Sequence, residues 1–79
     1  MTAGADLIYS LHADRKLRRL NLPRVAARHV FGDYDACIER DDNCRELTGS
    51  WEGRRLTVVV TDDTDPPKVV TVFDLGKGG

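Results

Sequence analysis

One short run, residues 56–61 (LTVVVT), constrains the fold of this chain more than any other segment. Five of its six residues are β-branched, which favours a strand. Successive side chains of a strand point to opposite faces, so this strand would present apolar side chains on both. Strands of that kind lie inside a sheet with cover on each side. We therefore expect a central strand that is covered on each face or lies at an interface.

The segments around this run alternate between apolar and polar residues, as strands with one buried face do. Turns or loops rich in Asp, Gly and Pro separate them, at residues 41–43, 52–53 and 62–67. Strands that short turns join pair antiparallel. The sequence thus predicts a four-stranded antiparallel meander, with strands at residues 34–39, 44–51, 56–61 and 68–73.

The beginning of the chain has helical spacing instead. Apolar residues recur at i, i+4 and i+7 within residues 11–20, as Ala13, Leu17 and Leu20. We expect a short helix there with these side chains toward the core. Residues 7–11 have the composition of a short first strand, and Ser10 is alternatively the cap of the helix.

A second helix is expected after Pro23, whose missing N–H is not needed in a first turn, with Gly32 as its stop. Its apolar face is expected to hold Leu22, Val25, Ala26, His29 and Val30. His29 is then a core or capping histidine rather than a catalytic one. Arg24 and Arg28 lie on the opposite face, toward solvent or a partner. Two helices followed by a run of strands define an α+β fold.

The length of 79 residues, 41% of them hydrophobic, suffices for one small core. We expect a single domain over residues 1–79, with flexible ends at 1–6 and 76–79. No apolar run approaches the roughly 20 residues that a membrane span needs. The first residues also lack the basic and apolar regions of a signal peptide, so we expect a cytoplasmic location.

The two cysteines do not form a known motif. Cys37 and Cys44 lie seven residues apart, which favours reduced thiols over a disulfide framework. A zinc set would have to combine them with His12 and His29, without the short paired spacings of structural zinc. We expect no metal and no cofactor.

The net charge of −1 conceals a strong asymmetry. Residues 1–30 contain six basic and two acidic side chains, a net charge of +4, whereas residues 31–79 contain six basic and eleven acidic ones, a net charge of −5. A basic face suits phosphate or an acidic protein, while acidic loops repel a long nucleic acid laid across the whole molecule. The alternative is that both are simply solvated faces.

Several spaced patterns carry a family resemblance. They are His12 and Ala13 followed by Lys16 on the first helix, a second helix that starts at Pro23 and ends at residues 30–33 (VFGD), residues 53–60 (GRRLTVVV) and residues 70–73 (VTVF). Over residues 7–73 the chain resembles the RelE/ParE superfamily of small toxins, above all the BrnT-like toxins and a related uncharacterised family that opens with His-Ala.

The resemblance implies a RelE-like domain in which two helices pack on a twisted antiparallel sheet. For many relatives it also implies metal-independent cleavage of RNA by a protein that a partner antitoxin neutralises. Other relatives bind a protein target and cut nothing. The chain departs from the pattern in two ways. It has Leu20 near the position where a second Arg is common in the His-Ala family. Its pI is near 6.0, whereas toxins that cleave nucleic acid are usually basic.

RNA cleavage without a metal needs a base, an acid and cations that stabilise charge on the phosphate. His12, Lys16 and Arg19 form a stripe on the first helix at i, i+4 and i+7. The ordinary pKa of histidine, about 6.5, lets His12 take and give a proton near neutrality. Lys16 and Arg19 would hold phosphate oxygens. The Thr71 hydroxyl, on the last strand, is the fourth catalytic candidate.

The substrate-binding candidates are Arg15 on the first helix and Arg54 and Arg55 at the start of the long strand. Tyr9, Tyr34 and Trp51 have rings that stack on bases, although core and rim positions explain them more simply.

Two main functional hypotheses follow. The first is a small ribonuclease of a toxin–antitoxin type, with RNA as substrate and an antitoxin as partner. The second is a non-catalytic RelE-like module whose basic helical face docks an acidic protein. A homo-oligomeric structural protein is a third alternative, because a second copy would cover the doubly apolar strand at residues 56–61.

Overall fold

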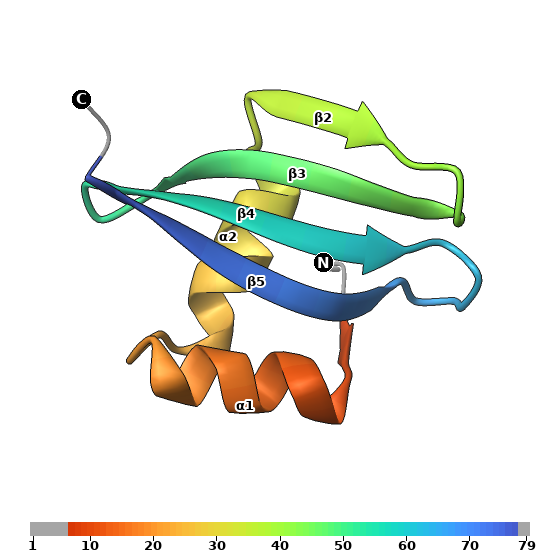
Figure 1. Cartoon of the computed structure of the whole chain (residues 1–79), viewed down its shortest axis with the longest axis horizontal. Helices are drawn as coiled ribbons and strands as arrows, with labels where there is room; N and C mark the ends of the chain where they lie inside the picture. Colours follow the sequence, from red (N-terminus) through yellow and green to blue (C-terminus); the bar gives the residue numbers. More distant parts are fainter. Residues whose placement is uncertain (1–6, 78–79) are drawn as a thin grey trace, which may run out of the picture.

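The structure, a computed structural model, describes residues 7–77 and has an α+β fold, as the sequence predicts (Figure 1). Its elements in chain order are β1 (Ile8–Tyr9), α1 (Leu11–Arg19), α2 (Arg24–Gly32), β2 (Ala36–Glu39), β3 (Cys44–Trp51), β4 (Arg54–Thr61) and β5 (Lys68–Lys77). The meander of β2 to β5 is confirmed. Residues 1–6 and 78–79, predicted to be flexible, lie outside the described residues, whereas residues 76–77, predicted to be part of a flexible tail, belong to β5.

The sheet has five strands in the order β1-β5-β4-β3-β2, one more than the meander that the sequence predicts. The additional strand, β1, pairs parallel to β5, so the expectation of a purely antiparallel sheet is wrong. The backbone N–H of Ile8 donates to Pro67, and that of Ser10 donates to Val69, both at 3.0 Å. These bonds put residues 8–10 beside the last strand, which brings α1 alongside β5 (Figure 1).

Helix α1 begins where the sequence suggests two alternatives, and both occur. Ser10 follows the short strand and also caps the helix, since its hydroxyl accepts a hydrogen bond from the Ala13 N–H at 3.0 Å. Ala13 and Leu17 are buried, and Leu20 is half-buried against the core. The predicted apolar stripe therefore faces the sheet, and its neighbouring stripe lies outside the core.

Helix α2 is rotated relative to the prediction. Its buried residues are Ala26, Ala27 and Val30, while Val25 is 52% exposed and His29 is exposed, so neither is a core residue. The small alanines allow α2 to lie close against the sheet. Pro23 is the residue before the first turn, and the helix includes Gly32 and is capped by Asp33.

One glycine is required by this close packing. A Cβ atom on Gly49 of β3 would lie 3.2 Å from the Asp33 carbonyl oxygen and 3.3 Å from the Cα atom of Tyr34. Both are backbone atoms, which move less readily than a flexible side chain. Gly49 therefore lets the connection between α2 and β2 pass directly over the sheet.

Strand β4 is buried along residues 56–61 on both faces, as its composition predicts. Leu56, Val58 and Val60 face the helices and join the core, with Leu47, Val69 and Val72 from neighbouring strands. Thr57 and Val59 point to the other face and are covered within the same chain. The need of this strand for cover thus gives no reason to expect a second copy. Neither helix in residues 7–77 is long and apolar enough to span a membrane.

Two irregularities in β5 decide where its side chains point. Register shifts leave Val70 and Leu75 as extra residues opposite β4. As a result Val69 and Val72 both pair with core residues of β4, at Val60 and Val58. Thr71 lies between them and points to the face of the sheet opposite the core.

Candidate functional site

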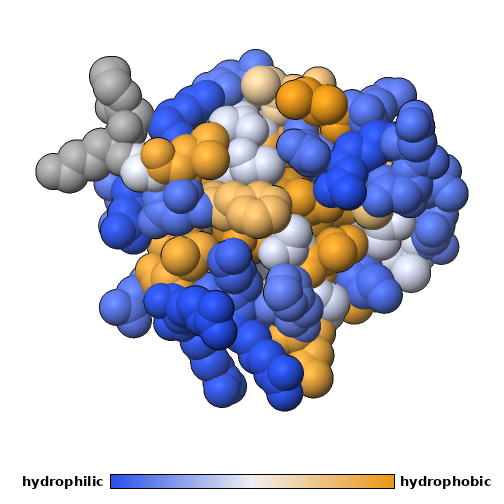
Figure 2. All heavy atoms as spheres, in the orientation of Figure 1, coloured by the Kyte–Doolittle hydropathy of each residue, from blue (hydrophilic) through white to orange (hydrophobic). Residues whose placement is uncertain are grey.

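The face of the sheet opposite the helices, called here the open face, carries the residues of the candidate site. Figure 2 looks onto it, because α2 passes behind β3 and β4 in the same orientation of Figure 1. Hydrophobic and neutral residues occupy the middle of this face, and hydrophilic residues surround it, densely so along the lower edge over α1. Pairing register and strand alternation place on it Thr71 and Phe73 of β5, Arg55, Thr57 and Val59 of β4, and Glu46, Thr48 and Ser50 of β3.

His12 and Thr71 meet at the edge of the open face. His12 lies in the first turn of α1, and its Nε2 atom is 3.1 Å from the Thr71 Oγ1 atom, within hydrogen-bond distance. The imidazole is exposed, so it is accessible to a ligand while the hydroxyl fixes its orientation. The structure thus brings together two of the four predicted catalytic residues, 59 positions apart in the sequence.

Lys16, one turn further along α1, extends over the same strand. Its Nζ atom lies 5.1 Å from the centre of the Phe73 ring, a cation–π arrangement. Phe73 is 43% exposed and was not predicted as a site residue. The sequence could have indicated it, because Phe73 is two residues after Thr71 and strand alternation puts both side chains on one face.

The basic side chains of α1 have no acidic partners among the side chains that the structure describes. The only acidic residue of this helix, Asp14, is bound by Arg24 of α2. The α1 residues without an ion pair in the described part of the chain are Arg15, Lys16, Arg18 and Arg19. Arg19 shares the stripe of His12 and Lys16. The positive charge of α1 is therefore available to an anionic ligand.

The two arginines at the start of β4 differ. Arg55 lies on the open face, where its Nη1 and Nη2 atoms donate to the Asp35 carboxylate at 2.6 and 2.8 Å. These hydrogen bonds hold the pKa of Asp35 below its ordinary value. Arg54 points to the helix side and contacts Asp74. Arg55 thus shares a face with Thr71 but is engaged by an acid, and Arg54 is not part of this site.

The predicted aromatic candidates lie elsewhere, and Tyr34 belongs to the connection between α2 and β2. The Tyr9 hydroxyl donates to the Arg24 carbonyl oxygen at 3.1 Å, and its ring lies under the Arg24 guanidinium, so Tyr9 serves the packing of α2. The pKa of Tyr9 is raised by burial. Trp51 contacts the His29 ring, with centres 5.5 Å apart. Phe73 is therefore the aromatic side chain of the candidate site.

The cysteines and histidines are not assembled into a metal site in the described part of the chain. Both thiols are free, and burial raises the pKa of Cys44. Within residues 7–77 no three His, Cys, Asp or Glu side chains come together in a way that could hold a metal ion. The chemistry that the site supports is proton transfer by His12 beside cations from α1.

The sequence and the fold were also compared with known proteins. No family model, no curated protein and no solved structure matches this chain.

Proposed function

We propose that the protein is a small metal-independent ribonuclease whose active site lies where α1 meets β5. The observation that carries this proposal is the hydrogen bond between His12 and Thr71, next to basic side chains of α1 that have no acidic partner within residues 7–77. A proton-transfer group held in a fixed orientation beside cations is what transfer of a phosphodiester needs. The resemblance of the sequence to RelE-like toxins points to the same reaction.

In the proposed reaction, the neutral imidazole of His12 takes the proton of a ribose 2′-hydroxyl. The 2′-oxygen attacks the adjacent phosphorus, and the bond from phosphorus to the 5′-oxygen of the next nucleotide breaks. The imidazolium returns its proton to that 5′-oxygen, which leaves a 2′,3′-cyclic phosphate and a free 5′-hydroxyl. Lys16 and Arg19 stabilise the negative charge that builds up on the phosphate oxygens. Thr71 keeps the ring oriented.

Charge on the open face determines the path of the substrate. Asp35 and Glu46, on the β3 side of this face, are already paired with Arg55 and Arg40, whereas the basic side chains of α1 have no ion pair in the described part of the chain. A single strand of RNA is therefore expected to follow the edge between α1 and β5. Phe73 lies along this edge with its ring partly exposed. A base of the RNA can therefore stack on the ring.

The second candidate is a module that docks an acidic protein on α1 and cuts nothing. The acidic excess of residues 31–79 favours it, because a net charge of −5 hinders a long polyanion while α1 stays open to a compact acidic surface. A cognate antitoxin would be one such partner.

Incubation of the purified protein with a mixed RNA in EDTA tests the proposal. We expect cleavage that ends in 2′,3′-cyclic phosphates and that the His12→Ala substitution abolishes. His29→Ala is the matched control, since His29 is also exposed but lies on α2. Circular dichroism should show equal folding of all three proteins. Equal cleavage by the His12→Ala protein contradicts the assignment, and an intact RNA in every sample supports the protein-binding module.

A further inference from the structure

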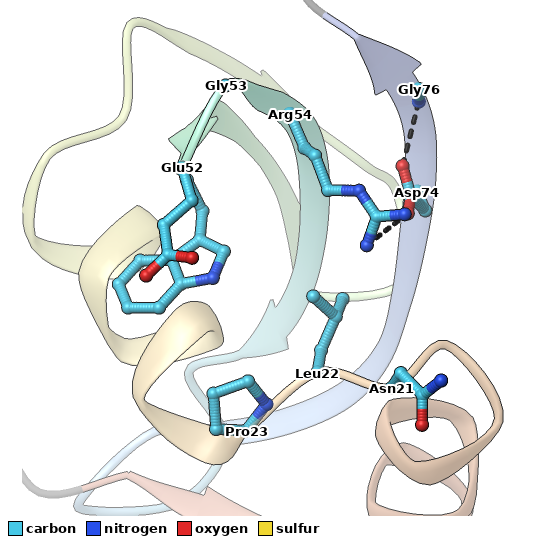
Figure 3. A pocket seen from close by; sticks show the side chains of 9 residues that line it. Asn21, Leu22, Pro23, Glu52, Gly53, Arg54, Asp74 and Gly76 are labelled. Carbon is cyan, nitrogen blue, oxygen red and sulfur yellow. Dashed lines mark hydrogen bonds and ion pairs between the residues drawn. The ribbon is translucent and has the colours of Figure 1, made fainter.

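A hollow of about 840 Å³ lies at one end of the sheet, beside the corner between α1 and α2 (Figure 3). It is separate from the His12 site, because its strand residues are on the helix side of the sheet. Its apolar wall consists of Leu22, Pro23 and Trp51, and its polar groups are Asn21, Glu52, Arg54 and Asp74. The ribonuclease mechanism uses none of these side chains.

The turn between β3 and β4 holds two of these residues in place. Glu52 and Gly53 both have positive φ angles, 47° and 80°, as a two-residue hairpin turn of the tight mirror-image kind requires. The flanking residues Trp51 and Arg54 are directly paired across the ladder. The indole and the guanidinium therefore form adjacent walls of the hollow.

Asp74 directs an incompletely used carboxylate into the hollow. Its side chain is only 14% exposed, and its Oδ1 atom accepts a hydrogen bond from the Gly76 N–H at 2.8 Å. The Oδ2 atom has only a long ionic contact of 3.5 Å with Arg54, which reaches across from β4 (Figure 3). Within the described side chains this oxygen accepts no hydrogen bond, so a ligand N–H is its natural partner.

The charges inside and outside the hollow distinguish the parts of a nucleotide. Two carboxylates and one guanidinium line the hollow, so a phosphate group is unfavourable inside it. Arg18 and Arg19 are in the last turn of α1, three and two residues before Asn21 at the rim. A phosphate held by these arginines would leave its base free to enter the hollow.

We propose that this hollow binds a guanine base, and the proposal rests on RNA as the ligand of the protein. Guanine presents two N–H donors, N1–H and the 2-amino group, side by side, and a carboxylate such as that of Asp74 accepts both. Its O6 atom accepts from Arg54, and the ring lies against Trp51. Adenine instead presents an acceptor at N1, which a carboxylate repels. The hollow thereby selects guanine over adenine.

Because Trp51 is the only tryptophan of the chain, its fluorescence reports on the hollow directly. We expect GMP to quench it in a saturable way, with an affinity at least about tenfold higher than those of AMP, CMP and UMP. Asp74→Asn should remove this preference, because the amide retains an acceptor for Gly76 but cannot accept both guanine donors. Asp62→Asn is the control, since Asp62 pairs with Arg45 at the opposite end of β4.

Three outcomes overturn the inference: no quenching, equal affinity for the four nucleotides, or an equal effect of the two substitutions. Quenching by arginine amide without quenching by GMP also overturns it, and assigns the hollow to a basic side chain of a protein partner. Cleavage of RNA is measured separately. Binding of GMP by a protein that leaves RNA intact supports the guanine site and contradicts the ribonuclease, whereas cleavage without GMP binding does the reverse.

Discussion

The Arg24 guanidinium holds the Asp14 carboxylate through two parallel hydrogen bonds, from Nε at 2.9 Å and from Nη2 at 2.6 Å. The pair joins α1 to α2 across their corner, and the same guanidinium lies 4.8 Å from the centre of the Tyr9 ring. The hydrogen bond from Arg24 holds the pKa of Asp14 below its ordinary value. Three elements thus meet at one charged contact on the surface.

This contact makes stability depend on pH. A carboxyl group with a lowered pKa in the folded state contributes stability above its ordinary pKa, and this contribution is lost as the pH falls through the folded value. Asp14→Asn should therefore lower stability at neutral pH, by a small and salt-sensitive amount because the pair is exposed. The difference from the native protein should shrink as the solution is acidified. Urea unfolding over a pH series measures it, with Asp65→Asn, in an exposed loop, as the control.

Thr71 should act on His12 by positioning it. Thr71→Val keeps a β-branched side chain in β5 but removes the hydroxyl, so we expect a normal fold and slower RNA cleavage. Thr71→Ser restores the hydroxyl and should recover most of the rate. Cleavage rates as a function of pH should be measured for all three proteins. If the Thr71→Val protein cleaves RNA as fast as the native one, the hydrogen bond between Thr71 and His12 is unimportant for cleavage.

The basic side chains of α1 should determine how binding of RNA depends on salt. Each phosphate contact that is lost reduces the slope of log K against log salt by about 0.7 for a single strand. Arg19→Ala is expected to reduce the slope by about this amount. Arg40→Ala is the control, because Arg40 is engaged by Asp42 and Glu46. Equal slopes for the native and Arg19→Ala proteins would remove Arg19 from the site.

Two glycines should respond in opposite ways to alanine. Gly49→Ala inserts a Cβ atom against the backbone of residues 33–34, and such overpacking costs about 1 to 3 kcal/mol of the free energy of unfolding. Gly32→Ala meets no atom within 4 Å in the last turn of α2 and should stabilise by about 0.5 to 1 kcal/mol. Thermal or urea unfolding of both variants provides the comparison. A Gly49→Ala protein of undiminished stability would mean that the connection yields easily.

Local patterns made most of the fold predictable. Spacing identified both helices, and the buried run at residues 56–61 identified the central strand. The predictions that were wrong concern contacts between segments that are far apart in the sequence. The exposure of Val25 follows from how two small alanines dock on the sheet, and the pairing of β1 with β5 joins opposite ends of the chain. Neither the exposure of Val25 nor the pairing of β1 with β5 can be predicted from a local pattern.

The candidate site was predictable in part for the same reason. The stripe of His12 and Lys16 is local and could be read directly. The facing of Thr71 could not, because strict alternation from the buried Val69 would turn it toward the helices. The extra residue Val70 reverses this direction. The hollow around Asp74 was missed because its walls come from a helix corner, a hairpin turn and the last strand.

The order of the strands also bears on self-association. Exposed strand edges invite other chains to extend a sheet. On one side of the sheet β1 pairs with the start of β5 and α1 packs against this strand, whereas on the other side β2 is an edge strand, with Ile38 61% exposed. Acidic side chains surround that edge, at Asp33, Asp35, Glu39, Asp41 and Asp42, with Arg40 as the only basic residue among them. Two copies meeting edge to edge at β2 would bring like charges together, so the charge around this edge strand discourages aggregation.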